Sequence, residues 1–358
     1  MTSPTTTGTT RTKPRGVHLV GSICGAPTAT AAFTTAATAL PSRLRRLPDG
    51  EPAHRSTFIG WQMGVFAAHT PALLRTYDSS YNPLPQPVLR ADQARALVAS
   101  MPRLEPGYDA AAIESYAAFR ELKAQGVVPE RARFQVCLPT AFCVMCLLRP
   151  GCQALVEPLY EQALVGCLRR IEAAVPAHEL AVQWDVAAEP MTLEGAYWPH
   201  FEPYFEGDVF EGLVGRIARL AGSVAEGVEV GLHVCYGDMG HKHFVEPKDM
   251  GLMARVVRGV VEGAGRKVDW VHLPVPRARD DGAYFEPLKS LELGDTELYL
   301  GLVHAHDKEG TERRLKVAQD VLGERMFGVA TECGLGRTPT EDFTSIAEIS
   351  CEVSAPIY

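Results

Sequence analysis

Short apolar runs alternate with longer stretches of helical periodicity along the chain after residue 16. This alternation is typical of a parallel α/β fold, in which a helix follows each strand and crosses back over the sheet. Eight such runs match the strand number of a (β/α)8 barrel. We therefore expect an α/β fold built as one TIM barrel over residues 16–358. The expected strands are Val17–Gly21, Arg43–Leu47, Arg133–Leu138, Ala181–Val186, Glu229–Val234, Val268–Leu273, Glu297–Val303 and Phe327–Thr331, and helices are expected at Ala110–Gln125, Leu155–Ala174, Val209–Ala225, Leu252–Gly263 and Thr311–Leu322.

Two stretches depart from the simple alternation. Residues 52–132 are long for one connection between the second and third strands, and they contain several prolines. A long connection in a compact domain usually has a function of its own, so we expect extra helices and a lid over one end of the barrel. Residues 236–250 form a second polar loop, after the fifth strand.

Composition narrows the class of protein. The chain has 358 residues, of which 46% are apolar and 22% charged, as is ordinary for a soluble globular protein. The net charge is −8 and no block of lysine and arginine stands out, so we expect no nucleic-acid partner. No run of 18 apolar residues occurs, so no membrane span is expected.

The nine cysteines are an odd number at irregular spacings, which does not fit a secreted disulfide framework and favours a reducing, cytoplasmic setting. Residues 1–15 are polar and rich in threonine, without the apolar core of a secretory signal. We interpret them as a disordered tail.

Chemically reactive side chains gather where the expected strands end. In a (β/α)8 barrel these carboxyl ends line one shared mouth, where the chemistry occurs. His233 and Cys235 are two residues apart, so they point to the same face of the fifth strand, and Cys333 follows the eighth strand. One imidazole and two thiolates would hold zinc and leave a position open for substrate. The alternative is that both cysteines are small buried packing residues.

Carboxylates and histidines occur at further strand ends. Glu51 and Asp185 could hold a substrate ammonium or act in acid–base chemistry, or they could simply cap loops or pair with nearby arginines. Gly21 and Ser22 offer backbone N–H groups and a hydroxyl to an anion. His304 is a candidate proton carrier at the end of the seventh strand.

Together these motifs resemble the catalytic barrel of cobalamin-independent methionine synthase, within the superfamily that it shares with uroporphyrinogen decarboxylase. The resemblance spans nearly the whole chain after residue 16. Its most specific pieces are GLHVCYGD, which resembles the family's His-x-Cys zinc strand, and TECGLGRT, which resembles its Cys-Gly-Leu strand end. VQWDVAAEP, LVGSI, PDGE and LGLVHAHD resemble the Gln-x-Asp segment, the opening Ile-Gly-Ser turn, the His-Gly-Glu segment and the strand with the catalytic histidine.

The resemblance implies zinc ligands at His233, Cys235 and Cys333, with the zinc activating a substrate thiol. It also implies an amino-acid pocket in which the turn of Val20, Gly21 and Ser22 meets the carboxylate. Glu51 and Asp185 would then meet the ammonium, with His304 as the catalytic histidine. Glu189 and Arg277, near the ends of the fourth and sixth strands, complete the candidate substrate-binding residues.

Two departures from the family pattern matter. The family's fourth zinc ligand is a glutamate on the sixth strand, and Pro274 occupies that position here. His272, two residues earlier, is a candidate substitute; otherwise three ligands and the substrate complete the shell, or metal binding is lost. The aromatic residue that stacks on folate in the family falls near Met145, so folate is a doubtful cofactor.

Three functions remain open at this point. The leading hypothesis is a zinc-dependent, transferase-like enzyme that activates a thiol- or amine-bearing small molecule, by methyl or alkyl transfer. The second is a metal-independent lyase or decarboxylase in which Arg55, Arg277 or Arg337 holds substrate carboxylates. The third is a non-enzymatic small-molecule binding protein on the same barrel.

Overall fold

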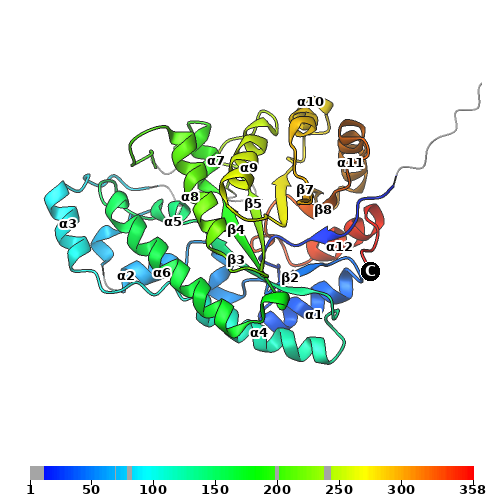
Figure 1. The fold of residues 1–358 in the computed structure, drawn as a ribbon, viewed down its shortest axis with the longest axis horizontal. Helices are drawn as coiled ribbons and strands as arrows, with labels where there is room; N and C mark the ends of the chain where they lie inside the picture. Colours follow the sequence, from blue (N-terminus) through cyan, green and yellow to red (C-terminus); the bar gives the residue numbers. More distant parts are fainter. Residues whose placement is uncertain (1–11, 69, 79–82, 198–200, 238–242) are drawn as a thin grey trace, which may run out of the picture.

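The computed structural model describes residues 12–358 apart from 69, 79–82, 198–200 and 238–242. Eight parallel strands form one sheet in the order β1-β8-β7-β6-β5-β4-β3-β2, which confirms the predicted barrel (Figure 1). The parallel bridges Val17–Leu44 and Ser22–Gly50 bring the two edge strands together and nearly close it. The strands are β1 (Val17–His18), β2 (Arg46–Pro48), β3 (Arg133–Pro139), β4 (Leu180–Val186), β5 (Glu229–Val234), β6 (Trp270–Pro274), β7 (Glu297–Val303) and β8 (Gly328–Thr331).

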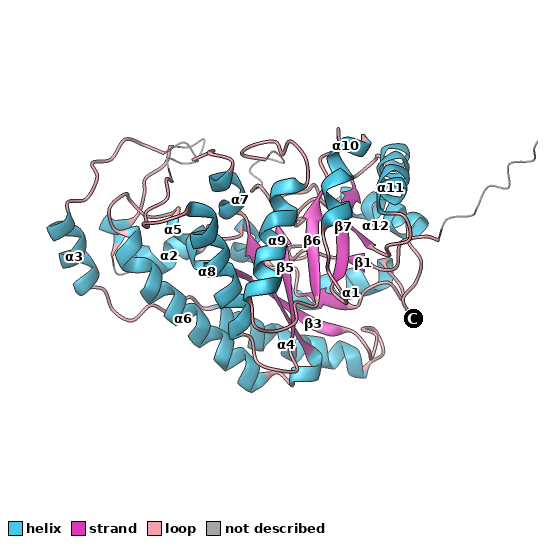
Figure 2. Ribbon diagram, turned by 45° about the horizontal axis from the view of Figure 1, so that its top comes forward, coloured by secondary structure: helices cyan, strands magenta, loops and turns pink. Residues whose placement is uncertain are grey.

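Helices surround the strands on the outside of the barrel (Figure 2). Their inner faces carry the apolar residues of one large core, for example Leu213, Ile217 and Leu220 on one helix. Within the described part of the chain no helix is long and apolar enough to cross a membrane. The α-helices are α1 (Ala29–Ala39), α2 (Gln62–Ala67), α3 (Ala91–Ala99), α4 (Tyr108–Ala124), α5 (Ala141–Met145), α6 (Gln153–Ala174), α7 (Ala188–Leu193), α8 (Val209–Ser223), α9 (Gly251–Gly263), α10 (Gly282–Phe285), α11 (Lys308–Leu322) and α12 (Asp342–Val353), with short 3-10 helices at Ala53–Thr57, Pro71–Leu73, Ala177–Glu179 and Glu286–Ser290.

The long connection between β2 and β3 does build the extra helices that its length predicts. It contains α2, α3 and α4, of which α4 packs on the barrel against α1 while α2 and α3 extend to one side beyond α5 (Figure 1). Its first residues, 56–60, with Met63, lie over one side of the barrel mouth and line a cavity there. This segment therefore covers part of the mouth, as expected of a lid.

The chain just before the expected start of the barrel at residue 16 is bound to the barrel. The backbone of Arg15 bonds to Phe327, and Pro14 accepts a hydrogen bond from Ala355, so this segment lies beside the start of β8 and the C-terminus. Backbone hydrogen bonds therefore hold residues 14 and 15 of the expected tail against the barrel. Residues 1–11 lie outside the described part.

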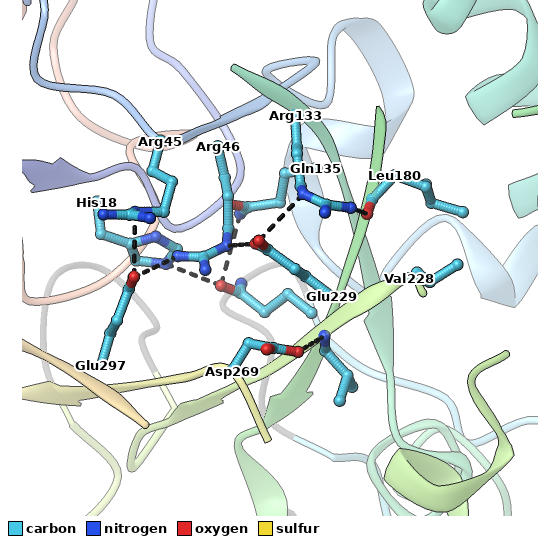
Figure 3. Close-up of polar contacts among 12 residues, drawn as sticks. His18, Arg45, Arg46, Arg133, Gln135, Leu180, Val228, Glu229, Asp269 and Glu297 are labelled. Atoms are coloured by element: carbon cyan, nitrogen blue, oxygen red, sulfur yellow. Dashed lines mark hydrogen bonds and ion pairs between the residues drawn. The ribbon is translucent and has the colours of Figure 1, made fainter. Parts of the chain in front are cut away.

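The base of the barrel interior is closed by a network of charged side chains at the amino ends of the strands (Figure 3). Arg46 bonds to Glu229 at 2.6 Å and to Glu297 at 2.9 Å, and its guanidinium lies 4.0 Å from the ring centre of Trp270. Gly231 makes room for that ring, since a Cβ at this position would stand 2.0 Å from it. The interior is therefore solid below the mouth, and a ligand can enter only from the carboxyl ends of the strands.

Candidate metal and substrate site

Three metal-ligating side chains converge at the mouth, and they are the three that the sequence predicts. The ligand atoms of His233, Cys235 and Cys333 all lie within 4.8 Å of one another, and Cys333 Sγ is 3.7 Å from His233 Nε2. Tetrahedral zinc, with bonds of about 2.0–2.3 Å, separates its nitrogen and sulfur ligands by about 3.6–3.8 Å. Small side-chain movements would therefore bring the group to this geometry.

Burial and neighbouring groups set the protonation of these three side chains. The pKa of Cys235 is raised well above its usual value by its hydrogen bond to Cys333 and by burial. Burial likewise holds the pKa of His233 well below its usual range, so the imidazole is neutral. A neutral imidazole is the form that binds metal, and a bound cation would favour the thiolates.

His272 lies behind His233 rather than beside it. The two residues pair in register across β5 and β6, and their Nδ1 atoms are 2.7 Å apart. The other nitrogen, His272 Nε2, is 3.0 Å from the carbonyl of Thr331. Because both ring nitrogens are engaged, the expected role of His272 as a substitute fourth ligand is not supported by this arrangement. Burial lowers the pKa of His272 to about 3, so its ring is neutral.

Two carboxylates face the same cavity from β2 and β4. The Ser22–Gly50 bridge brings the turn after β1 against Glu51. A Cβ placed on Gly21 would stand 3.3 Å from Glu51 Oε2. Burial, with repulsion from Asp49, raises the pKa of Glu51 to about 7. Burial and then repulsion from Glu51 raise the pKa of Asp185 well above its usual value. A cation bound between these two carboxylates would relieve both effects.

Glu51 also has a left-handed backbone, with φ of +48°. This conformation is unusual for a residue other than glycine, and such strain gathers at functional sites. Asp49 holds the turn, since its carboxylate accepts the Glu51 N–H at 2.9 Å and pairs with Arg55 at 2.6 Å. Arg55 is thus bound to Asp49 rather than presented to a substrate carboxylate.

Two buried glutamines fix the turn of Val20, Gly21 and Ser22 from below. The carbonyl of Val20 accepts from Gln183 Nε2 at 2.6 Å and from Gln135 Nε2 at 3.1 Å. Gln183 also donates to Asp185 at 2.8 Å, so one amide orients both the turn and the carboxylate. The Ser22 hydroxyl accepts the N–H of Gly336 at 2.8 Å, which joins this turn to the segment after β8.

These groups surround a cavity of about 620 Å³ at the mouth. The metal-ligating trio, the two carboxylates and the turn after β1 all line it, together with the aromatic rings of Phe58, Tyr77 and Phe244. Cys143, Cys146 and Arg337 line it too. The sequence gives no signal for Cys143 and Cys146 as cavity residues, because only the register of β3 brings the helix that follows it to the rim of the mouth.

A second cavity of about 560 Å³ adjoins the first and shares Cys333 and Gly334 with it. His304 and Arg277 line this second cavity, not the first. His304 Nε2 donates to the carbonyl of Val275 at 2.9 Å, and its Nδ1 lies 3.9 Å from Glu332. Burial, reinforced by Arg314, lowers the pKa of His304 to about 4, so the ring is neutral at pH 7.

Arg277 and Glu189 lie apart from the carboxylate pair. The side chain of Arg277 is 61% exposed and sits 3.5 Å from Asp307, at the outer edge of the second cavity. Glu189 is fully buried behind the first cavity, where it accepts from Cys143 Sγ at 3.3 Å, and burial raises its pKa to about 7. Both residues were predicted to bind substrate, but neither lines the first cavity. The reason is that α7 turns Glu189 inward and the loop after β6 carries Arg277 outward.

The residue at the expected folate-stacking position gives no support to a folate site. Met145 is fully buried in the core and lines neither cavity. It offers no flat ring and no surface on which a pterin could stack.

Comparison with known proteins extends the description of the fold. No family model and no curated protein matches this sequence. Among solved structures, the putative vitamin-B12-independent methionine synthase from Listeria monocytogenes is 13% identical with a TM-score of 0.53, covering 95% of this chain and 96% of that one. The B12-independent methionine synthase from Shewanella sp. W3-18-1, solved in complex with selenomethionine, is 13% identical with a TM-score of 0.44, covering 76% and 68%. The likeness to the Listeria protein shows a shared barrel fold over almost the full length of both chains.

Proposed function

We propose that this protein is a zinc-dependent enzyme that transfers a methyl or alkyl group to or from the sulfur of a small aminothiol. The observation that carries the proposal is the convergence of His233, Cys235 and Cys333 in one cavity with Glu51 and Asp185, two buried carboxylates whose pKa values are raised. Zinc held by the three ligands would keep a substrate sulfur as thiolate, because a coordinated thiol loses its proton near neutral pH. The Listeria structure supports the proposal through its fold alone.

Other residues of the two cavities would bind the substrate and transfer a proton. Glu51 and Asp185 bind and orient the substrate ammonium, because a cation between them lowers the cost of their buried charges. The Val20–Ser22 turn receives the other end of the substrate. His304, in the adjoining cavity, is the candidate proton carrier, through its Nδ1, because its Nε2 donates to the Val275 carbonyl. The two cavities meet at Cys333, so two substrates can approach the metal group from different sides.

The metal-independent lyase is the weaker alternative. Of its three proposed carboxylate-binding arginines, Arg55 is paired with Asp49 and Arg277 lies in the other cavity. Arg337 does line the first cavity, but it shares that space with Glu51 and Asp185. Two buried acids disfavour a substrate with several carboxylates, so the cavity is better matched to a cation.

Metal analysis of the purified protein, with a zinc-edge absorption spectrum, tests the proposal. We expect one zinc per chain with two sulfur ligands, and three after cysteamine is added. Ethanolamine, which lacks the thiol, should leave the count at two, and 2-mercaptoethanol, which lacks the amine, should require a much higher concentration than cysteamine.

Matched variants complete the test. Cys235→Ser and Cys333→Ser should each lose the bound zinc, whereas Cys351→Ser, which removes a cysteine far from the mouth, should keep it. A wild-type protein without stoichiometric zinc, or with full turnover after exhaustive chelation, would overturn the proposal in favour of the metal-independent alternative.

A further inference from the structure

Hydrogen-bond directions beneath the metal group can be assigned from chemistry alone. The carbonyl of Thr331 can only accept, so His272 carries its proton on Nε2 and donates it there at 3.0 Å. His272 is completely buried, and burial favours the neutral ring. Its Nδ1 is therefore a bare acceptor.

The partner of that acceptor is His233. Its Nδ1 lies 2.7 Å from His272 Nδ1, so His233 must carry its own proton on Nδ1 and donate it. The lone pair of His233 is then left on Nε2, the atom that lies 3.7 Å from Cys333 Sγ. One chain of hydrogen bonds, from His233 through His272 to Thr331, thus turns the metal-binding nitrogen toward the thiols.

The same chain fixes the direction of the ring. The two imidazole rings pair edge to edge, since their centroids are 4.8 Å apart, their planes are inclined by 29° and their Nδ1 atoms are 2.7 Å apart. Thr331 precedes Cys333 by two residues on the end of β8, and its hydroxyl donates to the Cys333 carbonyl at 2.8 Å. Gly301 on β7 leaves space for the Thr331 carbonyl that meets His272, since a Cβ on Gly301 would stand 2.9 Å from that carbonyl oxygen. The anchor of the histidine pair and one cysteine ligand therefore belong to the same strand end.

We propose that His272 is a positioning residue: it holds His233 as the Nδ1–H tautomer and presents its Nε2 to the metal. Ligand histidines commonly donate their second N–H to a carboxylate, a carbonyl or water, and here a neutral histidine takes that place. This inference rests on the proposed zinc site for its purpose, but the tautomers themselves can be observed without any metal.

The experiment uses the metal-free protein and Zn²⁺ as the only ligand. Long-range proton–nitrogen NMR correlations of histidine-labelled protein should show His233 protonated on Nδ1 and His272 on Nε2. His272→Phe, which keeps a flat ring without an acceptor, should weaken Zn²⁺ affinity by about 10- to 100-fold in competition with a chromophoric chelator. It should also remove the Nδ1–H signature of His233.

Two further variants separate positioning from folding. His272→Asn returns an acceptor near the Nδ1 position and should recover most of the affinity. His18→Phe is the matched control: His18 is also buried in the barrel, with its ring centroid 5.6 Å from that of His272, but it bonds to Gln183. It should destabilise the protein without a comparable loss of Zn²⁺ affinity.

The outcomes distinguish the two proposals. A wild-type protein that binds no Zn²⁺ contradicts the proposed function, while the NMR spectrum still decides the tautomers. Tight Zn²⁺ binding that His272→Phe leaves unchanged, or an Nε2–H signature for His233, overturns the positioning role of His272.

Discussion

The two ends of the barrel interior handle buried charge in opposite ways. At the base, Arg46 stands between Glu229 and Glu297, and its attraction lowers the pKa of Glu297 although burial acts to raise it (Figure 3). At the mouth, burial and repulsion from Asp49 raise the pKa of Glu51, and burial and repulsion from Glu51 raise the pKa of Asp185. A buried carboxylate whose pKa the fold lowers serves the structure, whereas buried carboxylates whose pKa values the fold raises mark a place where a ligand is expected.

The largest effect on stability should come from removing the positive charge of Arg46 at the base. Arg46→Met leaves Glu229 and Glu297 without their buried partner, and removing one member of a buried ion pair costs about 3–5 kcal/mol of unfolding free energy. Urea denaturation followed by circular dichroism measures this loss as a lower midpoint at unchanged slope.

Zn²⁺ affinity provides the control for the Arg46 variant, because Arg46 touches none of the metal-ligating residues. The affinity of the folded variant should stay close to that of the wild type. A stability within about 1 kcal/mol of wild type would mean that the base network is no more than a surface ion pair and would remove the contrast between the two ends.

At the mouth, replacing the Glu51 carboxylate by a neutral amide should raise the free energy of unfolding, whereas the Arg46 substitution at the base lowers it. The pKa of Glu51 is about 7 in the folded protein and ordinarily 4.5, so the folded state binds more protons between these values. Stability is therefore lost as the pH rises from about 4.5 to 7, and the cost is complete above 7. Glu51→Gln should unfold at higher urea at pH 8, by about 1–2 kcal/mol, with little difference at pH 4.

Glu297→Gln is the matched control for Glu51→Gln. The pKa of Glu297 is lowered, so its ionised form stabilises the fold and the variant should be less stable at pH 8. The variant can also be compared with the wild type in ligand binding. Glu51→Gln should weaken the binding of cysteamine more than the binding of 2-mercaptoethanol. Equal losses for the two thiols, or a loss of stability at pH 8, would show that Glu51 is a structural residue.

Periodicity predicts the barrel, and the chemistry of the strand ends predicts that His233, Cys235 and Cys333 come together at its mouth. The His-x-Cys spacing of His233 and Cys235 places both side chains on one face of a strand whatever the register, so this pair is visible in the sequence alone. The contact between His233 and His272 is not visible there, because it depends on which residue of β6 lies beside His233. Only the structure supplies that register.

The sequence is least informative where loops decide the position of a side chain. His304 and Arg277 follow strand ends as expected, but the chain that carries them leads into the second cavity. Glu189 follows β4 at a distance that suits the mouth, yet the first turn of α7 directs it into the core. Strand ends thus predict the right rim of the barrel without telling which part of it a side chain will line.

The smallest effect belongs to an ion pair at the edge of the base network. Arg45 binds the same carboxylate as Arg46, with Nε 3.0 Å from Glu297 Oε1, but its side chain is 45% exposed where that of Arg46 is 2% exposed. Solvent and salt screen such a pair, so Arg45→Ala should cost less than about 1 kcal/mol, and less still in 1 M salt. Urea denaturation at low and high salt measures both values beside Arg46→Met. Comparable losses for the two variants would mean that Glu297 needs positive charge nearby rather than a buried partner, and burial would then no longer explain why the base and the mouth differ.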